Sequence, residues 1–296
     1  MEPINKEGKT LTKNKEKIRE AVRKSYGKIA KNVSVVSGIG AASSCCGTTK
    51  TSTSTGSSVS CCGGPDVSTK QMSELMGYSK EDLESIPEGA NMGLGCGNPV
   101  ALVSLKPGET VVDLGSGGGF DCFLAAKQVG KTGHVIGVDM TPEMITKARM
   151  NAGKIGAENI EFRLGEIERL PVVDNSVDII MSNCVINLSP DKSKVYREVF
   201  RILKPGGRLA IADIVATAPL PQEIQEDLAL VAECLGGAAT IDDTKEMLKA
   251  AGFQKIKIQS KDGSRELIQA WDPHKRQDAG DFVVSAYIEA VKPSST

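Results

Sequence analysis

Apolar side chains recur at helical spacing near the start of the chain. The positions are Ile18, Val22, Tyr26 and Ile29. Because residues three or four apart lie on one face of a helix, this spacing predicts an amphipathic helix over about residues 15–32. We expect its apolar face to dock on the rest of the protein.

The apolar pattern disappears between residues 43 and 64. Every residue in this tract except Lys50 and Val59 is Ser, Thr, Gly or Cys. Such a tract cannot bury enough apolar surface to offset the backbone entropy lost on folding, so we expect it to be mobile. Residues 1–67 are therefore interpreted as a mobile N-terminal arm.

Residues 68–220 alternate short apolar runs with longer amphipathic segments. The expected strands are residues 110–114, 134–138, 160–164, 177–182 and 208–214. Helices are expected to begin at Ser79, Asn98-Pro99, Asp121, Thr141-Pro142 and Ser189-Pro190, and the last of them to end before the turn Pro205-Gly206-Gly207. Strands joined by helices of this length predict an α/β fold with a doubly wound, mostly parallel sheet and right-handed crossovers.

Residues 221–296 are expected to form a small C-terminal α+β extension. Helices are predicted over about residues 222–234 and 243–251, and strands over 255–259 and 282–291. The pattern leaves open whether these strands complete the sheet or form a separate unit. It also leaves open whether the segment closes over a site.

Composition limits the classes of function. The 36 Lys and Arg residues nearly balance the 37 Asp and Glu residues, and no basic stripe occurs, so nucleic-acid binding is not expected. The first residues lack the apolar stretch of a secretory signal, and no segment approaches the roughly 18 to 20 apolar residues of a membrane span. We expect a cytoplasmic monomer without a membrane partner. In a reducing compartment, eight cysteines favour metal or metalloid ligation, redox chemistry or core packing over a disulfide framework.

A glycine cluster follows the first expected strand. It reads Asp113-Leu114-Gly115-Ser116-Gly117-Gly118-Gly119-Phe120-Asp121. Glycine has no Cβ, so a turn of this kind lets the backbone approach a ligand closely. A dinucleotide fingerprint would need glycine at position 120 or 122, where the chain has Phe120 and Cys122. The spacing D-x-G-x-G-x-G instead resembles the S-adenosylmethionine loop of class I methyltransferases, which have a Rossmann-like fold.

Acidic residues at successive strand ends suit the same ligand. Asp139 ends the second strand, where a carboxylate can accept hydrogen bonds from both ribose hydroxyls, and Glu166 follows the third strand. Adenosylmethionine carries a sulfonium and an ammonium group rather than phosphates, so carboxylates help to bind it. The resemblance implies a cofactor site formed by Asp113, Gly115, Gly117, Gly119, Asp121, Asp139, Met140, Glu166, Ile167 and Asn183.

Three cysteines stand where a substrate site is expected. Cys184 follows the fourth strand and so faces the same crevice as the cofactor, and Cys234 is expected at the end of the helix after the fifth strand. Cys96 lies between glycines just ahead of Asn98-Pro99, where a helix dipole would favour its thiolate. Those glycines offer no packing partners, so a structural role fits Cys96 poorly. Cys122, inside a helix, is expected to be a small buried hydrophobe.

The chain resembles arsenite methyltransferases of the bacterial and archaeal type. The resemblance covers roughly residues 61–292, and its most specific pieces are the Cys-Gly pair before the first helix, the DLGSG loop, SNCVINL and ECLGGA. It implies that As(III) is bound as substrate by Cys96, Cys184 and Cys234. Sequence spacing alone does not show that these three side chains converge.

The resemblance also implies a redox partner for Cys96. In the family, a cysteine of the N-terminal region supplies electrons by forming a disulfide with the Cys96-type residue, and thioredoxin or another thiol then reduces that disulfide. The candidates here are Cys45, Cys46, Cys61 and Cys62, and we favour Cys61 or Cys62 because they lie nearer to the domain. Zinc binding by these doublets is not expected, since no C-x-x-C occurs in the chain.

The expected chemistry needs no general base. Soft thiolates select thiophilic ions, and three-coordinate As(III) keeps a lone pair that can attack the sulfonium methyl group without removal of a proton. Neither histidine stands where a catalytic base is expected, since His134 starts a strand and His274 lies in a late loop. Catalysis would then depend on holding donor and acceptor at near-attack distance.

The working hypothesis is thiol-dependent methylation of arsenite to methyl- and dimethylarsenicals, as a detoxification reaction. Two alternatives stay open. A methyltransferase acting on a quinone or another small organic molecule would share the glycine loop but would not need the cysteines after strands four and five. An arsenic-sequestering or arsenic-sensing protein on a methyltransferase scaffold would need the cysteines but not cofactor binding.

Overall fold

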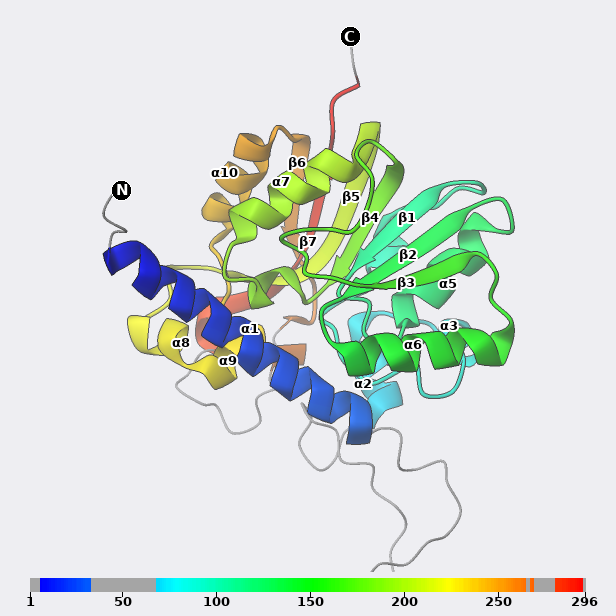
Figure 1. The fold of residues 1–296 in the computed structure, drawn as a ribbon, viewed down its shortest axis with the longest axis horizontal. Helices are drawn as coiled ribbons and strands as arrows, with labels where there is room; N and C mark the ends of the chain where they lie inside the picture. The colour runs from blue at the N-terminus through cyan, green and yellow to red at the C-terminus, as the bar shows by residue number, and fades with distance from the viewer. Residues whose placement is uncertain (1–5, 33–67, 265–266, 269–279, 295–296) are drawn as a thin grey trace, which may run out of the picture.

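The computed structural model describes residues 6–32, 68–264, 267–268 and 280–294, and Figure 1 shows their arrangement. The expected amphipathic helix is present as α1 (Lys6–Asn32), and Val22 and Ile29 on its apolar face are buried. The tract between residues 43 and 64, with its two cysteine doublets, lies outside the described residues.

The fold is built around one seven-stranded sheet. Its strands are β1 (Thr110–Leu114), β2 (His134–Asp139), β3 (Ile160–Leu164), β4 (Val177–Asn183), β5 (Leu203–Ala216), β6 (Gln254–Ser260) and β7 (Val283–Val291). They lie in the order β3-β2-β1-β4-β5-β7-β6. The first five strands pair in parallel, and β7 runs antiparallel to both of its neighbours. The two C-terminal strands therefore complete the sheet.

Helices connect the strands and cover the sheet. They are α2 (Thr69–Met76), α3 (Lys80–Glu84), α4 (Pro99–Leu102), α5 (Phe120–Val129), α6 (Pro142–Ile155), the 3-10 turn η2 (Ile186–Leu188), α7 (Lys192–Ile202), α8 (Gln222–Glu226), α9 (Leu228–Ala232) and α10 (Ile241–Ala251). In Figure 1, α5 lies behind the sheet and α7 and α10 lie in front of it.

Two apolar clusters fill the spaces between the sheet and its helices. Successive strand residues point to opposite faces, so Val111 belongs to the cluster that includes α5, and Val112 belongs to the cluster that includes α7 and α10. Near-continuous apolar runs such as β4 are expected where both faces of a strand are covered. The prediction of a doubly wound, mostly parallel α/β fold is confirmed.

Parallel pairing brings the carboxyl ends of the central strands together. Leu114 at the end of β1 is in register with Val138 of β2 and with Ser182 of β4, and Ser182 is in register with Ile211 of β5. The loops that follow these strands therefore open on one edge of the sheet. Open α/β sheets bind their ligands at this edge.

Several predicted boundaries were wrong, each for a local reason. A first helix, α2, precedes the expected start at Ser79, because Ser68 caps it in a reciprocal capping box with Gln71. The helix expected over residues 222–234 is divided at Asp227, whose carboxylate caps α9. Pro205-Gly206-Gly207 does not end a helix before a separate strand but lies inside β5, beside a register shift against β4.

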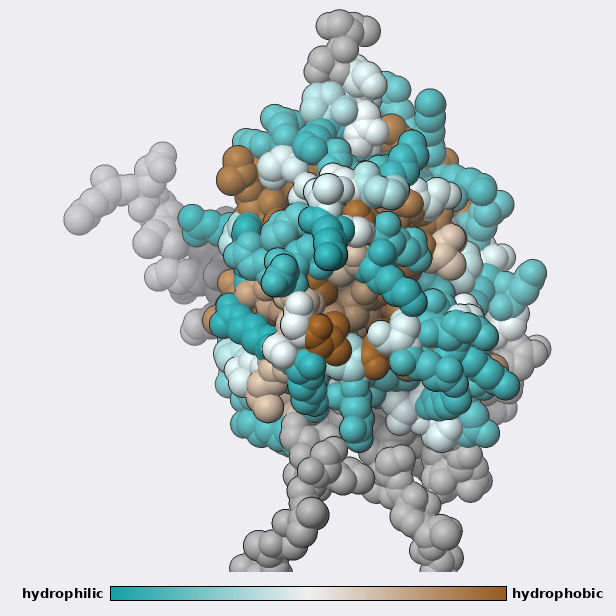
Figure 2. Space-filling view, turned by 90° about the vertical axis from the view of Figure 1, so that its right-hand side faces the viewer, coloured by the Kyte–Doolittle hydropathy of each residue, from teal (hydrophilic) through white to brown (hydrophobic). Residues whose placement is uncertain are grey.

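The edge strand β3 carries charged side chains. This strand pairs only with β2, and its edge carries Arg163 in a salt bridge with Glu161. Charged side chains on an edge strand discourage pairing with another chain. Figure 2, which views this side, shows apolar residues only in small groups among hydrophilic ones. Among the described residues, no helix has the length and apolar character needed to cross a membrane.

Replacing Ile180 by alanine tests how far the fold depends on the buried face of β4. Ile180 is fully buried, so we expect Ile180→Ala to lower the free energy of unfolding by about 2–5 kcal/mol in urea denaturation. Val173 is 74% exposed, and Val173→Ala, the matched control, should change that free energy by less than about 0.5 kcal/mol. Equal effects of the two substitutions would contradict the assigned core.

Candidate functional site

A pocket lies at the carboxyl ends of β1, β2 and β4. The glycine loop between β1 and α5 forms one wall, and its Gly115 and Gly117 have positive φ angles of 69° and 51°. Glycine adopts such angles without the steric cost that a Cβ brings. Asp139, at the end of β2, accepts hydrogen bonds from the backbone N–H of Gly117 and of Thr141 and so fixes the loop against β2.

Three buried aspartates line this pocket. Burial, together with the charge of Asp121, raises the pKa of Asp113 well above its ordinary value. Burial also raises the pKa of Asp121 to about 6 and raises the pKa of Asp139, although hydrogen bonds from Thr141 and Gly117 oppose the latter shift. Carboxylates crowded in this way are stabilised by a nearby positive charge. The pocket therefore favours a cationic ligand.

The pocket wall also contains a polar atom in need of a partner. The hydroxyl oxygen Oγ of Ser116 is buried and has no hydrogen-bond partner among the described residues. Buried hydroxyl groups are nearly always hydrogen-bonded, so this atom indicates a place where a polar ligand group fits.

Helix α1 closes one side of the pocket. Arg19, Val22 and Tyr26 line it from this helix, and Figure 1 shows α1 crossing the molecule from α9 to α6. Arg19 forms salt bridges with Glu166 at 3.5 Å and with Glu168 at 3.3 Å. The amphipathic spacing of α1 predicts the helix but carries no signal for where it docks, so this lining could not be predicted from the sequence.

Most of the predicted cofactor residues line this pocket. Those that do are Asp113, Gly115, Gly117, Asp121, Asp139, Met140, Ile167 and Asn183. Gly119 and Glu166 are not among the lining residues. Gly119 is the N-cap of α5, and Glu166 forms ion pairs with Arg19 and Arg23 of α1. Glu168, two residues further on, lines the pocket instead.

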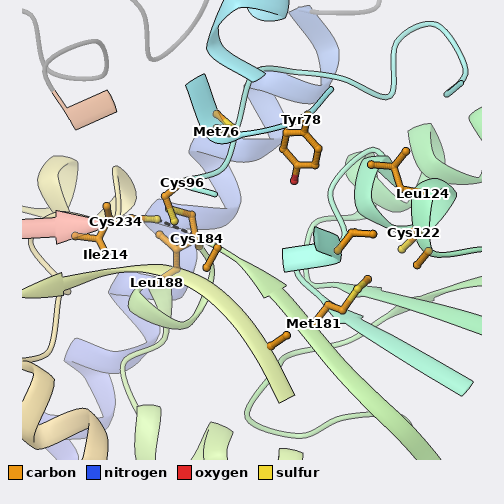
Figure 3. Packing of buried hydrophobic residues seen from close by; sticks show 14 of the residues in the cluster. Met76, Tyr78, Cys96, Cys122, Leu124, Met181, Cys184, Leu188, Ile214 and Cys234 are labelled. Carbon is orange, nitrogen blue, oxygen red and sulfur yellow. Dashed lines mark hydrogen bonds between the residues drawn. The ribbon is translucent and has the colours of Figure 1, made fainter. Parts of the chain in front are cut away.

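The three cysteines predicted to bind the substrate meet beside this pocket. Figure 3 shows the sulfur atoms of Cys96, Cys184 and Cys234 close together, and Cys122 apart from them. Cys184 itself lines the pocket. The sulfur atoms of Cys96 and Cys184 lie within 4.8 Å of one another. The structure thus brings together thiols from the loop before α4, the end of β4 and the turn after α9.

The backbone around Cys96 is held by two strands. Its N–H donates to Oδ1 of Asn183 at 2.8 Å, and its carbonyl accepts from Oγ of Ser285 on β7 at 2.7 Å. The glycines beside it permit this close approach, because a Cβ at Gly95 would stand 2.7 Å from the Asn183 side chain. The expectation that these glycines leave Cys96 without packing partners was wrong, since Cys96 is fully buried.

The other two cysteines adopt unusual backbone conformations. Cys184 and Cys234 have φ angles of 56° and 64°, in the left-handed region that non-glycine residues rarely occupy. The thiol of Cys234 donates to the backbone carbonyl of Cys184 at 2.8 Å. Such conformations persist where surrounding structure imposes them, and they concentrate at functional sites.

Burial favours the protonated thiols of Cys96 and Cys184. Burial raises the pKa of Cys96 to about 11, and burial together with hydrogen bonds to Cys234 and Cys96 raises the pKa of Cys184 well above its ordinary value. The expectation that a helix dipole would favour the Cys96 thiolate was therefore wrong. Helix α4 has four residues, and its dipole is outweighed by loss of water.

An additional acid, Asp213, belongs to the cysteine cluster. One of its carboxylate oxygens lies with the sulfur atoms of Cys96 and Cys184 so that all three atoms are within 4.8 Å of one another. Burial raises the pKa of Asp213 to about 6. The sequence alone does not reveal this residue, because an aspartate within the apolar run of β5 gives no sign of which neighbours it will meet.

Comparison with known proteins supports the fold. A family described as "Methyltransferase domain" matches residues 105–252. An arsenic(III) S-adenosylmethionine methyltransferase of known structure from Chlamydomonas reinhardtii is 32% identical, with a TM-score of 0.57, and the match covers 75% of this chain and 72% of that one.

Curated relatives are similar over a shorter share of their length. An arsenite methyltransferase of Halobacterium salinarum is 56% identical over 222 residues, which are 75% of this chain and 56% of the relative. An arsenite methyltransferase of Homo sapiens is 40% identical over 152 residues, 48% of this chain and 40% of the relative. The chain thus spans about half the length of the curated relatives that it matches.

The raised pKa of Cys96 predicts a loss of stability at alkaline pH. An unfolded cysteine ionises near the ordinary value of 9.0, whereas folded Cys96 keeps its proton up to about 11. Between these values the unfolded chain releases a proton that the folded chain retains, so the free energy of unfolding should fall as pH rises. The wild type should lose about 2–3 kcal/mol more than Cys96→Ala between pH 9 and 11 in urea denaturation. Parallel curves for the two proteins would contradict the assigned burial.

Proposed function

Because this chain belongs to the methyltransferase-domain family, we propose that it transfers the methyl group of S-adenosylmethionine to trivalent arsenic. The observation that carries the proposal is the meeting of three buried thiols, of which Cys184 lines an acidic pocket. Arsenic(III) prefers soft sulfur ligands. A site with several convergent thiols therefore suits As(III) better than it suits an organic substrate.

The pocket residues fit the proposed cofactor. When bound, S-adenosylmethionine supplies an electrophilic methyl group on a positively charged sulfur. Asp139 is suited to accept hydrogen bonds from ribose hydroxyls, and the crowded carboxylates of Asp113 and Asp121 are suited to a cationic ligand. The unpartnered hydroxyl of Ser116 offers one further polar contact.

The cysteines are proposed to bind arsenic by exchange. Arsenous acid carries three hydroxyl groups, and each thiol that replaces one releases a water molecule, which takes the thiol proton with it. The raised pKa values of Cys96 and Cys184 are therefore no obstacle to binding at neutral pH. Arsenic held by three sulfurs keeps a lone pair that can accept the methyl group without a general base. The chain's contribution is to hold it beside the pocket in a fixed orientation.

Methyl transfer raises the formal oxidation state of arsenic by two, so two electrons must be returned. We propose that Cys96 and one of Cys61 and Cys62 supply them by forming a disulfide, which thioredoxin or a small thiol then reduces. Repetition would yield methyl- and dimethylarsenicals, as expected of a detoxification reaction. Cys61 and Cys62 lie outside the described residues, so this step is supported by the family resemblance alone.

The activity is tested by incubating the protein with arsenite, S-adenosylmethionine and a thiol, and by following arsenic speciation over time. We expect Cys184→Ser to abolish methylation of arsenite, because an alcohol does not replace a thiol as a ligand of As(III), while cofactor affinity measured by calorimetry stays nearly unchanged. Cys122→Ser is the matched control, since Cys122 is buried away from the cluster and should leave the activity in place. Equal turnover of wild type and Cys184→Ser would rule out the thiolate site.

The same assay separates the alternatives. A protein that binds arsenite but not S-adenosylmethionine would be a sequestering or sensing protein. A protein that binds S-adenosylmethionine but leaves arsenite unmethylated would point to an organic substrate such as a quinone.

Replacing Cys61 and Cys62 together by serine tests the proposed electron supply. We expect the double variant to slow both methylations, because each one raises the oxidation state of arsenic by two and needs the two electrons that the disulfide supplies. Rates with arsenite and with methylarsenite as starting substrates are compared, and the Cys45→Ser/Cys46→Ser variant is the matched control. A double variant with wild-type rates on arsenite would show that this doublet is dispensable.

A further inference from the structure

We propose that the carboxylate of Asp213 stabilises the positive charge that arrives on arsenic during methyl transfer. The inference rests on the proposed function and assigns a role to a residue that is not one of the sulfur ligands. It is carried by the position of Asp213, by its hydrogen bonds and by the charge balance of the reaction.

Asp213 stands at the cysteine cluster on the inside of the protein. It belongs to β5 and is 2% exposed, and one of its oxygens lies within 4.8 Å of the sulfurs of both Cys96 and Cys184. An atom bound by both sulfurs would be close to this carboxylate. The two sulfurs and the carboxylate are buried, so the interaction between charges is stronger there than at the protein surface.

Asp213 is buried, which raises its pKa to about 6, but its hydrogen bonds favour the ionised carboxylate. It accepts hydrogen bonds from the backbone N–H of Ile186 at 3.0 Å and of Ile214 at 2.8 Å, and from the amide Nδ2 of Asn187 at 2.9 Å. Among the residues that the structure describes, Asp213 forms no salt bridge. The ammonium of Lys192 is near enough to favour the ionised carboxylate, but it donates its own hydrogen bond to the carbonyl of Ser189.

The charge of the arsenic site changes during the proposed step. Before transfer, arsenic bound by three thiolates is neutral. Its lone pair then forms the As–C bond, and the C–S bond breaks with its electron pair remaining on the donor sulfur. The positive charge thereby moves from sulfur to arsenic, and no proton moves. A fixed negative charge beside arsenic stabilises the transition state more than the ground state, which is the condition for lowering the barrier.

Asparagine at position 213 removes the charge and retains a similar shape. We expect Asp213→Asn to lower the single-turnover rate of the first methylation by roughly 10- to 100-fold. The half-saturating arsenite concentration and the affinity for S-adenosylmethionine should stay within about threefold of wild type, because the sulfur ligands and the pocket are retained. Single turnover with reduced enzyme keeps the disulfide step out of the measured rate.

Val215→Ala is the matched control for the structure of β5. Val215 is buried two residues from Asp213 on the same strand and belongs to the apolar cluster that includes α7 and α10, so its replacement disturbs the strand and leaves the carboxylate and its hydrogen bonds in place. We expect a rate within about threefold of wild type. Equal losses in Asp213→Asn and Val215→Ala would assign Asp213 a structural role and overturn the proposal.

Other outcomes are equally decisive. An unchanged rate in Asp213→Asn overturns the proposal, and so does a rise in the half-saturating arsenite concentration at an unchanged maximal rate, which would make Asp213 an arsenic ligand. If Asp213→Asn no longer binds S-adenosylmethionine, Lys192→Gln supplies the test. At pH 8, well above the pKa of Asp213, the carboxylate is ionised in both proteins, so loss of the positive charge of Lys192 should raise the rate, and an equal or lower rate overturns the proposal. Absence of methylation by the wild type would instead reject the proposed function.

Discussion

The amide side chain of Asn183 joins the two halves of the candidate site. Its oxygen accepts from the N–H of Cys96, and its nitrogen lies 2.9 Å from both the carbonyl oxygen of Gly97 and the hydroxyl of Tyr78. Tyr78 in turn donates to Asp121 in the pocket at 2.6 Å. Asn183 is the last residue of β4 and directly precedes Cys184. The end of this strand therefore positions the Cys184 thiol, the loop that carries Cys96 and, through Tyr78, the carboxylate of Asp121.

The site combines several features that lower stability. Two cysteines have left-handed backbone conformations, carboxylates are buried close to one another, and one hydroxyl has no partner among the described residues. Each of these costs free energy, and the two-sided core of the sheet offsets that cost. Bound ligands of the proposed kinds would relieve part of it, because a cation suits the carboxylates and a polar group suits Ser116.

Distant parts of the chain complete the site around the strand ends. Helix α1 closes the pocket through Arg19 and Tyr26, and β7, near the other end of the chain, holds the carbonyl of Cys96 through Ser285. The turn after α9 supplies Cys234. A site composed in this way exists only in the folded chain, so substitutions far from it in sequence can alter its geometry.

The sequence by itself determined the parallel sheet, the glycine loop and the strand ends at Asp139 and Asn183, because these depend on local periodicity and on residue types with distinct backbone preferences. It also singled out Cys96, Cys184 and Cys234, through motifs rather than through distance. Only the tertiary structure decided that their sulfurs meet, that Asp213 joins them and that Glu166 pairs with α1. Those contacts depend on how strands distant in sequence are ordered and in register, and local spacing carries no information about that.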